Sequence, residues 1–358
     1  MRYDISKFEE LVEQGFLRKS EKDDMVLYGY TDHCTFERHW NEYTRVARGL
    51  ILNKHTGEVI AKPFPKFFNL GEMPETFLPN VLIEKNYETF EKVDGSLGII
   101  FFHDGRWQIA TRGSFYSEQA QKGAELLKKY NLDRAPIGMT ILAEIIYPEN
   151  KIIVDYGDQE KLVVLGGFDR NSGHEFSPST MEDMAEFLGM EFAKRYSYTI
   201  EEMIALQKTM SKNEEGFVVR YSSGLRVKIK GDEYMKIAKM ISSMSPISFW
   251  ESMEGGVVNR TYLAQLPEDI RNEFEPIVDE LEQQYSKIMS EIVQDVSNLP
   301  TTELTHEGRK RIGIFLRDTK EIKHPSAMFP YLTGGKDNLD KYILKQIRPT
   351  GNVMRDVV

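Results

Sequence analysis

Short runs of alternating apolar and polar residues dominate positions 24–112, and this is the period of β-strands. Apolar runs flank the turn sequences KHTG (54–57) and DG (104–105), which predicts two β-hairpins over 46–64 and 97–112. The runs 139–147 and 161–169 also indicate strands, and a third hairpin is predicted over 215–230 around SSG.

Helical spacing separates these strands. Ser6 and Glu9 match a capping box, with Gly15 as a stop, so the chain is expected to open with a short helix. The segments 115–130, 181–190 and 201–210 also have helical spacing. Alternating hairpins and short helices favour an antiparallel α+β domain over residues 1–239, and argue against a doubly wound sheet.

The strand pattern fades after about residue 235. The segment 276–296 repeats apolar residues at helical spacing, with Pro276 expected in the first turn. We therefore expect a mostly helical C-terminal domain over 240–358. Within it, the basic stretch 306–324 is read either as a helix with a solvated cationic face or as a contact to a nucleic-acid backbone.

The composition is that of a globular protein. The chain has 358 residues, of which 41% are hydrophobic and 28% charged. It contains one cysteine, Cys34, its first residues are charged, and no run reaches the roughly 18 apolar residues of a membrane span, so a soluble, cytoplasmic protein is expected (in a host cell if the source is viral). The net charge of −10 argues only weakly against a nucleic-acid binder, because local clusters decide phosphate binding.

The sequence EKVDGS (91–96) contains a candidate nucleophile. Lys92 follows a predicted strand, and a lysine attacks phosphorus only when it is neutral, which requires a pKa below its usual value of about 10.4. Nearby cations, a bound metal and partial burial are expected to lower that pKa. Gly95 lets a ligand approach the backbone. Alone, K-x-D-G occurs by chance in roughly one such chain in ten, and a surface turn is then the simpler interpretation.

Charged residues at other strand ends change that interpretation. Lys228 and Lys230 share one face of a predicted strand, and with three further cations they would neutralise a triphosphate: Arg48, Lys66 and Arg112. Glu144 could accept hydrogen bonds from ribose hydroxyls. Glu215 could hold a hydrated Mg²⁺. Together these residues predict a nucleotide site.

In this order, K-x-D-G, R-G, E-G-F-V and K-x-K resemble the covalent nucleotidyltransferases, whose domain is an antiparallel-sheet, ATP-grasp-like ligase fold. ARGLILN, KFFNLGE and EKVDGS more specifically resemble the phage-type RNA ligase 1 family, over about residues 40–235. The resemblance implies an ATP-dependent RNA ligase that repairs cut tRNA. It uses ATP and Mg²⁺, with Mn²⁺ as the alternative ion, and joins RNA 3′-hydroxyl and 5′-phosphate ends.

The resemblance also implies a role for each matching residue. Lys92 would attack the α-phosphate of ATP, form lysyl-AMP, and pass AMP to an RNA 5′-phosphate. Lys228 and Lys230 would act with it as catalytic residues, and Glu215 would be the metal-linked acid. The nucleotide-binding set would be Arg48, Lys66, Phe68, Glu91, Lys92, Gly95, Arg112, Glu144, Glu215, Gly216, Lys228 and Lys230. The family often has lysine where Arg112 stands, and arginine keeps the charge with a different geometry.

Two other functions stay open at this point. A DNA ligase or mRNA capping enzyme would carry an oligonucleotide-binding β-barrel after the K-x-K strand, whereas this chain becomes helical. A non-catalytic ATP- or RNA-binding module would not need Lys92. His33, Cys34 and His39 lie close together, but their spacing fits no standard zinc pattern. Phe168 is read as a core aromatic or as a residue near the adenine.

Overall fold

The computed structural model describes residues 1–266 and 268–350. The chain divides into two compact units, Met1–Met235 and a second unit that begins at Lys236. The strands of the first unit are β1 Leu17–Lys22, β2 Met25–Tyr30, β3 Arg48–Asn53, β4 Val59–Ala61, β5 Phe68–Asn69, β6 Tyr87–Glu91, β7 Ser96–His103, β8 Arg106–Thr111, β9 Met139–Ile146, β10 Lys161–Asp169, β11 Glu191–Phe192, β12 Arg195–Tyr196, β13 Gly216–Tyr221 and β14 Arg226–Lys230. Its helices are α1 Ile5–Glu13, α2 Asp32–Phe36, α3 Glu42–Val46, α4 Leu78–Val81, α5 Glu118–Leu127, α6 Pro178–Leu188, α7 Ile200–Gln207 and the start of α8 Asp232–Ser242.

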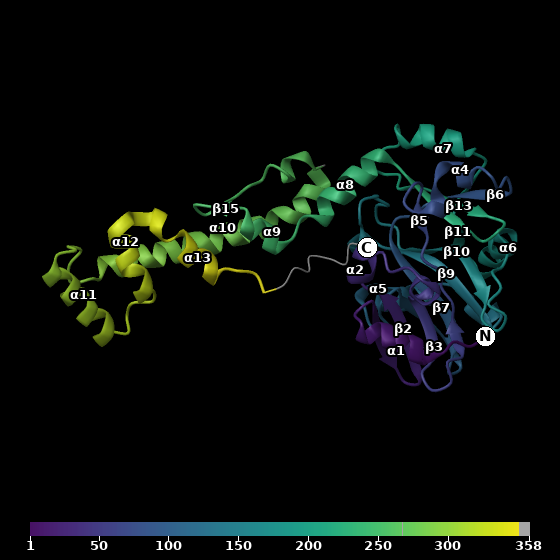
Figure 1. Cartoon of the computed structure of the whole chain (residues 1–358), viewed down its shortest axis with the longest axis horizontal. Coiled ribbons are helices and arrows are strands. Elements are labelled where there is room, and N and C mark those ends of the chain that lie inside the picture. Colours follow the sequence, from purple (N-terminus) through teal and green to yellow (C-terminus); the bar gives the residue numbers. More distant parts are fainter. Residues whose placement is uncertain (267, 351–358) are drawn as a thin grey trace. The chain divides into compact units, whose positions relative to one another are not determined.

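Three sheets form the first unit (Figure 1), with strand orders β1-β2-β3-β4, β11-β10-β9-β7-β8 and β12-β6-β13-β14-β5. All pairs are antiparallel except β10 with β11 and β14 with β5. The three predicted hairpins are confirmed as β3–β4, β7–β8 and β13–β14, and the α+β class is confirmed with them.

The second strand of the first sheet, β2, is buried on both faces. Met25 and Leu27 of β2 pack toward Ile99 of the second sheet, whereas Val26 and Tyr28 pack toward α1 and α3. Side chains of a strand alternate between faces, so every residue of β2 is buried. The second sheet packs its other face on α5 and α6, and the third sheet packs on α4 and α7.

A buried ion-pair network ties the third sheet to the segment after β10. Glu175 accepts hydrogen bonds from Arg220 Nε at 2.6 Å and from Arg226 Nη1 at 3.0 Å. Arg226 is buried, and burial lowers its pKa while Glu175 opposes that shift. An unpaired guanidinium would be costly in this place, so the network fixes one end of β14.

The second unit is mainly helical. Its helices are α9 Pro246–Glu251, α10 Glu268–Ser297, α11 His306–Asp318, α12 Met328–Gly334 and α13 Asp340–Gln346. In the described part of this unit, the strands are the short pair β15 Met253–Glu254 and β16 Val257–Val258. No helix of the described residues is both long enough and apolar enough to cross a membrane.

Two local predictions were wrong. Asp4, rather than Ser6, caps α1, because the Asp4 carboxylate accepts the backbone N–H of Ser6 at 3.0 Å. Pro276 lies inside α10 instead of in its first turn, since α10 begins at Glu268. Ile270 and Phe274 continue the apolar spacing of the helix before Pro276 and are buried, so the helix begins earlier than the proline suggested.

Candidate active site

Lys92 lies where the chain crosses from one sheet to another. β6 ends at Glu91 in the third sheet, and β7 begins at Ser96 in the second. The backbone N–H of Lys92 donates to the carbonyl of Gly216 at 2.9 Å, which continues the β6–β13 pairing by one residue. The crossing is tight, because a Cβ atom on Gly95 would lie 2.7 Å from the carbonyl oxygen of Ile145. Both sheets therefore surround the lysine.

Glu215 holds two lysines on one carboxylate. Lys92 Nζ lies 2.6 Å from Glu215 Oε2, and Lys230 Nζ lies 2.9 Å from Oε1. The Glu215 side chain is only 3% exposed. Burial alone raises the pKa of Glu215, but Lys92 and Lys230 outweigh it and lower the pKa. A buried acid is thus kept ionised by two cations.

The ion pair between Lys92 and Glu215 shows that the expected lowering of the Lys92 pKa was wrong. Burial lowers the pKa of Lys92, as expected, but the carboxylates of Glu215 and Glu144 outweigh burial and raise it. The resting lysine is therefore protonated. To act as the nucleophile that the sequence predicts, Lys92 would first have to release Glu215 and lose a proton.

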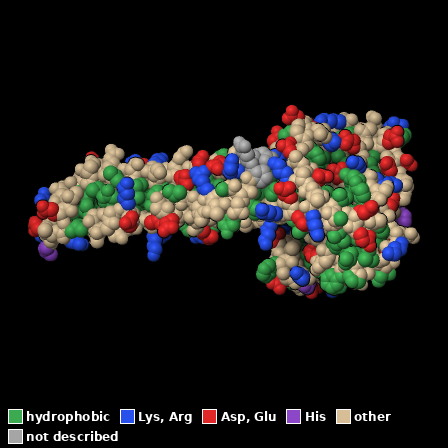
Figure 2. Space-filling model, turned by 90° about the horizontal axis from the view of Figure 1, so that it is seen from above, with side chains coloured by type: hydrophobic (Ala, Val, Ile, Leu, Met, Phe, Trp, Pro, Cys, Tyr) green, Lys and Arg blue, Asp and Glu red, His purple; other side chains and the backbone are tan. Residues whose placement is uncertain are grey.

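Four cations line the same region and form no salt bridge among the described residues: Arg48, Lys66, Arg112 and Lys228. Burial lowers the pKa of Lys228 well below its usual value, and Lys66 and Lys92 lower it further. Acidic and basic side chains are interspersed over the face in Figure 2. The net charge of the chain sums over all of them and therefore does not reveal a local cluster of cations. All four are partly buried, and cations that repel one another in such a place indicate an anionic ligand of several charges.

Aromatic rings support these cations. The Lys66 ammonium lies 5.0 Å from the Tyr30 ring centre and 5.5 Å from that of Phe68. Arg48 and Lys228 both lie over Phe67, at 5.3 and 5.1 Å. A ring face attracts a cation without neutralising it, so the charge remains available to a ligand.

Tyr30 is a site residue that the sequence did not reveal. Burial raises the pKa of its hydroxyl, but Lys66, Arg48 and Arg112 outweigh burial and bring the pKa to about 8. Trp40 was missed as well, although the Lys66 ammonium lies 5.2 Å from its ring centre. An aromatic residue in or near a buried strand has the same appearance in sequence as a core residue, and only the fold places these two beside the cations.

Glu144 belongs to β9 and is buried. Burial is the main reason that its pKa rises to about 8, with Lys92 opposing the shift and Glu215 adding to it. Near neutral pH much of Glu144 is therefore the neutral acid, which can both donate and accept a hydrogen bond.

Most of the predicted residues therefore share one region between the second and third sheets. Phe68 is buried and lies under Lys66. A Cβ atom on Gly216, whose φ is 137°, would lie 2.1 Å from the carbonyl of Ile229. The side chain of Glu91 is the exception. Its charged neighbours are led by Lys194 and Lys161, so only its backbone adjoins Lys92.

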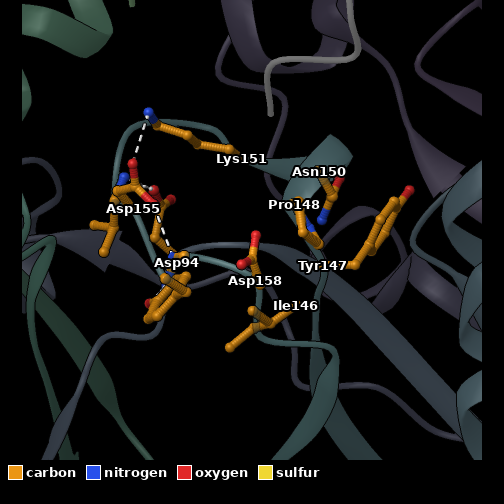
Figure 3. Close-up of a pocket in the computed structure, with 11 residues that line it drawn as sticks. Asp94, Ile146, Tyr147, Pro148, Asn150, Lys151, Asp155 and Asp158 are labelled. Atoms are coloured by element: carbon orange, nitrogen blue, oxygen red, sulfur yellow. Dashed lines mark hydrogen bonds and ion pairs between the residues drawn. The ribbon is translucent and has the colours of Figure 1, made fainter. Parts of the chain in front are cut away.

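Asp94 anchors the loop that contains Lys92. Its carboxylate is buried and accepts hydrogen bonds from the backbone N–H groups of Ile153 (3.0 Å) and Val154 (2.9 Å) and from the Tyr234 hydroxyl (2.7 Å). The Asp94 N–H donates to the Tyr156 hydroxyl at 2.9 Å. Asp94 also lines a pocket of about 340 Å³ bounded by residues 146–158 (Figure 3). The loop is thereby fixed to two other segments.

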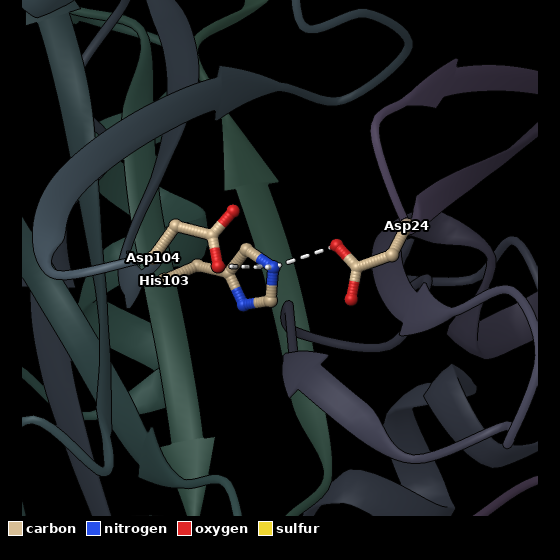
Figure 4. Close-up of side chains that lie close together, drawn as sticks. All are labelled: Asp24, His103 and Asp104. Carbon is tan, nitrogen blue, oxygen red and sulfur yellow. Dashed lines mark hydrogen bonds and ion pairs between the residues drawn. The ribbon is translucent and has the colours of Figure 1, made fainter.

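Two groups of potential metal ligands lie outside this region. Asp24 Oδ1 lies 2.8 Å from His103 Nε2, with Asp104 nearby (Figure 4), and this is a contact between the β1–β2 and β7–β8 turns. The second is the sequence cluster around Cys34. Its thiol lies 3.4 Å from the His39 carbonyl, while the rings of His33 and His39 stack on Phe16. These stacked rings give no metal geometry.

A family model described as RNA ligase matches residues 46–234, which is more than half of the chain. This chain belongs to the RNA ligase family. The matched range contains Arg48, Lys92, Glu215 and Lys230, and it ends near the boundary of the first unit. The resemblance to the phage-type RNA ligase 1 family is thus confirmed.

Two curated relatives are similar over part of their length. A Thermovibrio ammonificans protein named "Putative RNA ligase" is 29% identical over 216 residues, covering 57% of this chain and 54% of the relative. An Autographa californica nuclear polyhedrosis virus protein named "Putative bifunctional polynucleotide kinase/RNA ligase" is 26% identical over 262 residues, covering 64% of this chain and 37% of the relative. The chain thus spans about half or less of their length.

A solved structure supports the fold. An Aquifex aeolicus protein titled "Putative ATP-dependent DNA ligase" matches with a TM-score of 0.50 and 15% sequence identity. The match covers 93% of this chain and 99% of that chain. This chain thus shares its fold with a protein titled as a DNA ligase.

Proposed function

We propose that this chain is an ATP-dependent RNA ligase, which joins an RNA 3′-hydroxyl to an RNA 5′-phosphate through a lysyl-AMP intermediate. The observation that carries the proposal is the position of Lys92. It is bound to a buried acid and faces a region where four cations form no salt bridge among the described residues. A nucleotide triphosphate supplies the missing negative charge, and family membership supports RNA as the second substrate.

The chemistry has three steps. The neutral amine of Lys92 attacks the α-phosphorus of ATP, so a nitrogen–phosphorus bond forms, the bond to pyrophosphate breaks, and the amine proton is lost to solvent. An oxygen of the RNA 5′-phosphate then attacks the same phosphorus and releases Lys92. Finally, the RNA 3′-hydroxyl attacks the activated 5′-phosphate, and AMP leaves. Each step develops charge on phosphate oxygens, which Lys228 and Lys230 are placed to stabilise.

A divalent ion fits the donor chemistry of Glu215. Magnesium prefers oxygen ligands and is commonly bound by one or two carboxylates together with substrate phosphates. Glu215 would hold Mg²⁺, or Mn²⁺ in its place. When bound, the ion supplies positive charge to the phosphate oxygens. Glu144, as a neutral acid, could hydrogen-bond to ribose hydroxyls in either direction.

We assign adenylyl transfer to the N-terminal domain, residues 1–239, and RNA recognition to the helical C-terminal domain, residues 240–358. The absence of a β-barrel from the described part of the second unit supports an RNA ligase over a DNA ligase or a capping enzyme. Cleaved tRNA in the cytoplasm is the proposed natural substrate. Comparing the sealing of cleaved tRNA, generic single strands and nicked duplexes tests this assignment, and equal sealing of all three would contradict it.

The test of the function itself is covalent labelling. The protein is incubated with Mg²⁺ and ATP labelled on the α-phosphate, then denatured and separated by electrophoresis. We expect label on the wild-type protein and none on Lys92→Ala. Label that persists in Lys92→Ala would reject the nucleophile. An unlabelled wild-type protein that still binds ATP would instead indicate the alternative, a non-catalytic ATP- or RNA-binding module.

A further inference from the structure

We propose that single-stranded RNA lies across an outer corner of the first unit, where Arg18 contacts a backbone phosphate and Phe36 stacks on a base. We define the outer corner as Phe16, Arg18, His33 and Phe36. This inference rests on the proposed function and names the surface that would present the RNA to the site.

The position of Arg18 extends the cation cluster outward. In the first sheet, Arg18 of β1 pairs with Gly29 of β2, and Gly29 pairs with Arg48 of β3. Arg18 Nε and the Arg112 carbonyl both lie within 4 Å of a Cβ atom built on Gly29, so Arg18 is on the face over which Arg112 passes. The register of β2 with β3 shifts at Gly29, in a β-bulge. The sheet thus places Arg18 and the partly buried Arg48 in one row across three strands, with Arg18 on the edge strand.

Two glycines make room for this row. The backbone of Arg112 and Gly113 lies over Gly29, since a Cβ atom on Gly29 would be 3.0 Å from the Arg112 carbonyl oxygen. The Arg18 guanidinium in turn lies against Gly113, where a Cβ atom would be 2.3 Å from Arg18 Nη2. Arg18 therefore adjoins the backbone that carries Arg112.

Arg18 is exposed, and its side chain makes no hydrogen bond or ion pair among the described residues. Under the proposed function, six cations are already assigned to the three phosphates of ATP: Arg48, Lys66, Lys92, Arg112, Lys228 and Lys230. A further cation beyond Arg112 is therefore placed for a phosphate that does not belong to the nucleotide. The backbone of a bound RNA strand supplies such phosphates at regular spacing.

Aromatic side chains accompany Arg18 at the outer corner. The His33 ring stacks on Phe16 with a centre distance of 5.0 Å, which fixes α2 beside the start of β1. Phe36, the last residue of α2, is 85% exposed, the highest value among the large hydrophobic residues described. A cation for the phosphate and a free ring for the base are the two elements of single-strand binding.

The outer corner also has exposed acids close by, Asp32 and Glu37, so it is not a uniformly basic patch. What distinguishes Arg18 is its place beside Arg112, in line with the partly buried cations. Binding of an acidic protein partner would depend on the charge of Arg18 alone. Binding of an RNA strand would depend on both the Arg18 charge and the Phe36 ring.

The experiment measures binding of a short 5′-phosphorylated single-stranded RNA across a range of salt concentrations. We expect Arg18→Ala to weaken binding about fivefold and to reduce the slope of log affinity against log salt by about 0.7, the value for one lost phosphate contact. Phe36→Ala should weaken binding about tenfold without changing that slope, because stacking releases no counterions. Covalent labelling by ATP alone should stay at the wild-type level in both variants.

Arg106→Ala is the matched control, since Arg106 is an exposed arginine at the far end of β8 from Arg112. Wild-type RNA affinity and salt slope in Arg18→Ala would overturn the inference while the ligase assignment stood. Equal losses in Arg18→Ala and Arg106→Ala would overturn it too, since they would indicate a general charge effect. Loss of ATP labelling in the wild-type protein would instead reject the proposed function.

Discussion

Lys92 and Lys230 bind opposite oxygens of one buried carboxylate, that of Glu215. The carboxylate therefore fixes the distance between the nucleophile and a lysine of the K-x-K strand. It also keeps Lys92 protonated until another cation takes its place. The site is thus held in a resting state by the residue that is proposed to bind the metal.

Replacement of Lys92 separates charge from nucleophilicity. Lys92→Ala and Lys92→Arg should both abolish covalent labelling by ATP, because neither side chain can form the phosphoramidate. Lys92→Arg keeps a cation beside Glu215 and should therefore unfold at nearly the wild-type temperature. Measuring both labelling and thermal unfolding tests this prediction, and labelling of Lys92→Arg would contradict it.

Removal of the Glu215 charge distinguishes two roles of this acid. Glu215→Gln lowers the pKa of Lys92, because the main cause of its rise is lost. If Glu215 only restrained Lys92, labelling would become faster near neutral pH. We expect instead a fall of about 100-fold, since the acid is also needed to hold the metal. The rate of labelling against pH and Mg²⁺ concentration decides between these outcomes, and a faster variant would refute the metal role.

Arg112 should tolerate lysine better than alanine. Arg112→Lys keeps the charge and loses the bidentate geometry, so labelling by ATP should fall by less than about tenfold. Arg112→Ala removes one of the unpaired cations and should cost about 100-fold by analogy with a lost oxyanion contact. Rate constants for the two variants give the comparison. Wild-type rates in both variants would show that Arg112 does not contact ATP.

The buried Glu144 predicts how stability depends on pH. Its pKa is about 8 in the folded protein, against 4.5 as its ordinary value. Between these values the unfolded chain releases a proton that the folded chain keeps, so this group makes folding less favourable as pH rises, by at most about 1.4 kcal/mol per pH unit. Below pH 4.5 and above about pH 8, the contribution of Glu144 to the free energy of unfolding no longer changes with pH.

Glu144→Gln removes that dependence. Relative to the wild type, the variant should gain stability between about pH 5.5 and about pH 7.5, measured as the urea midpoint of the first unit. A stability difference between the two proteins that stays constant across this range would contradict the shifted pKa.

The Glu175 network should matter for stability and little for chemistry. Glu175→Gln leaves the buried Arg226 without its carboxylate, which typically costs about 3–5 kcal/mol. Lys19→Gln is a control that removes a more exposed pair, with an expected cost below about 1 kcal/mol. Urea unfolding measures the loss in free energy of unfolding for both variants. Equal losses would show that the Glu175 network stabilises the fold no more than an exposed ion pair does.

The sequence revealed the parts of the site that follow from strand periodicity and motif order. Lys228 and Lys230 share a face because alternate residues of a strand do so, and the hairpins around DG and SSG followed from their turn residues. The salt bridge between Lys92 and Glu215 could not be predicted, because 123 residues separate them and only the pairing of β6 with β13 brings them together.

The protonation of Lys92 was missed for the same reason. The expectation counted the cations around Lys92 and not the acids, and the acids decide the sign of the shift. Tyr30 was missed because core aromatics and site aromatics have the same pattern along a strand, and Trp40 because it lies in the loop between α2 and α3, where no local pattern indicated the site. Likewise, nothing in the local sequence shows that Tyr234 reaches Asp94 across 140 residues.

The bond from Tyr234 to Asp94 has a practical consequence for anyone who wishes to study the catalytic unit alone. Tyr234 is the next-to-last residue of the first unit, yet it secures the turn that follows the nucleophile by two positions. A truncation just after the K-x-K strand would remove this hydroxyl and release the turn. A loss of labelling in the truncated protein could then be attributed wrongly to the missing helices of the second unit. A truncated protein that contains only the first unit should therefore end beyond Tyr234.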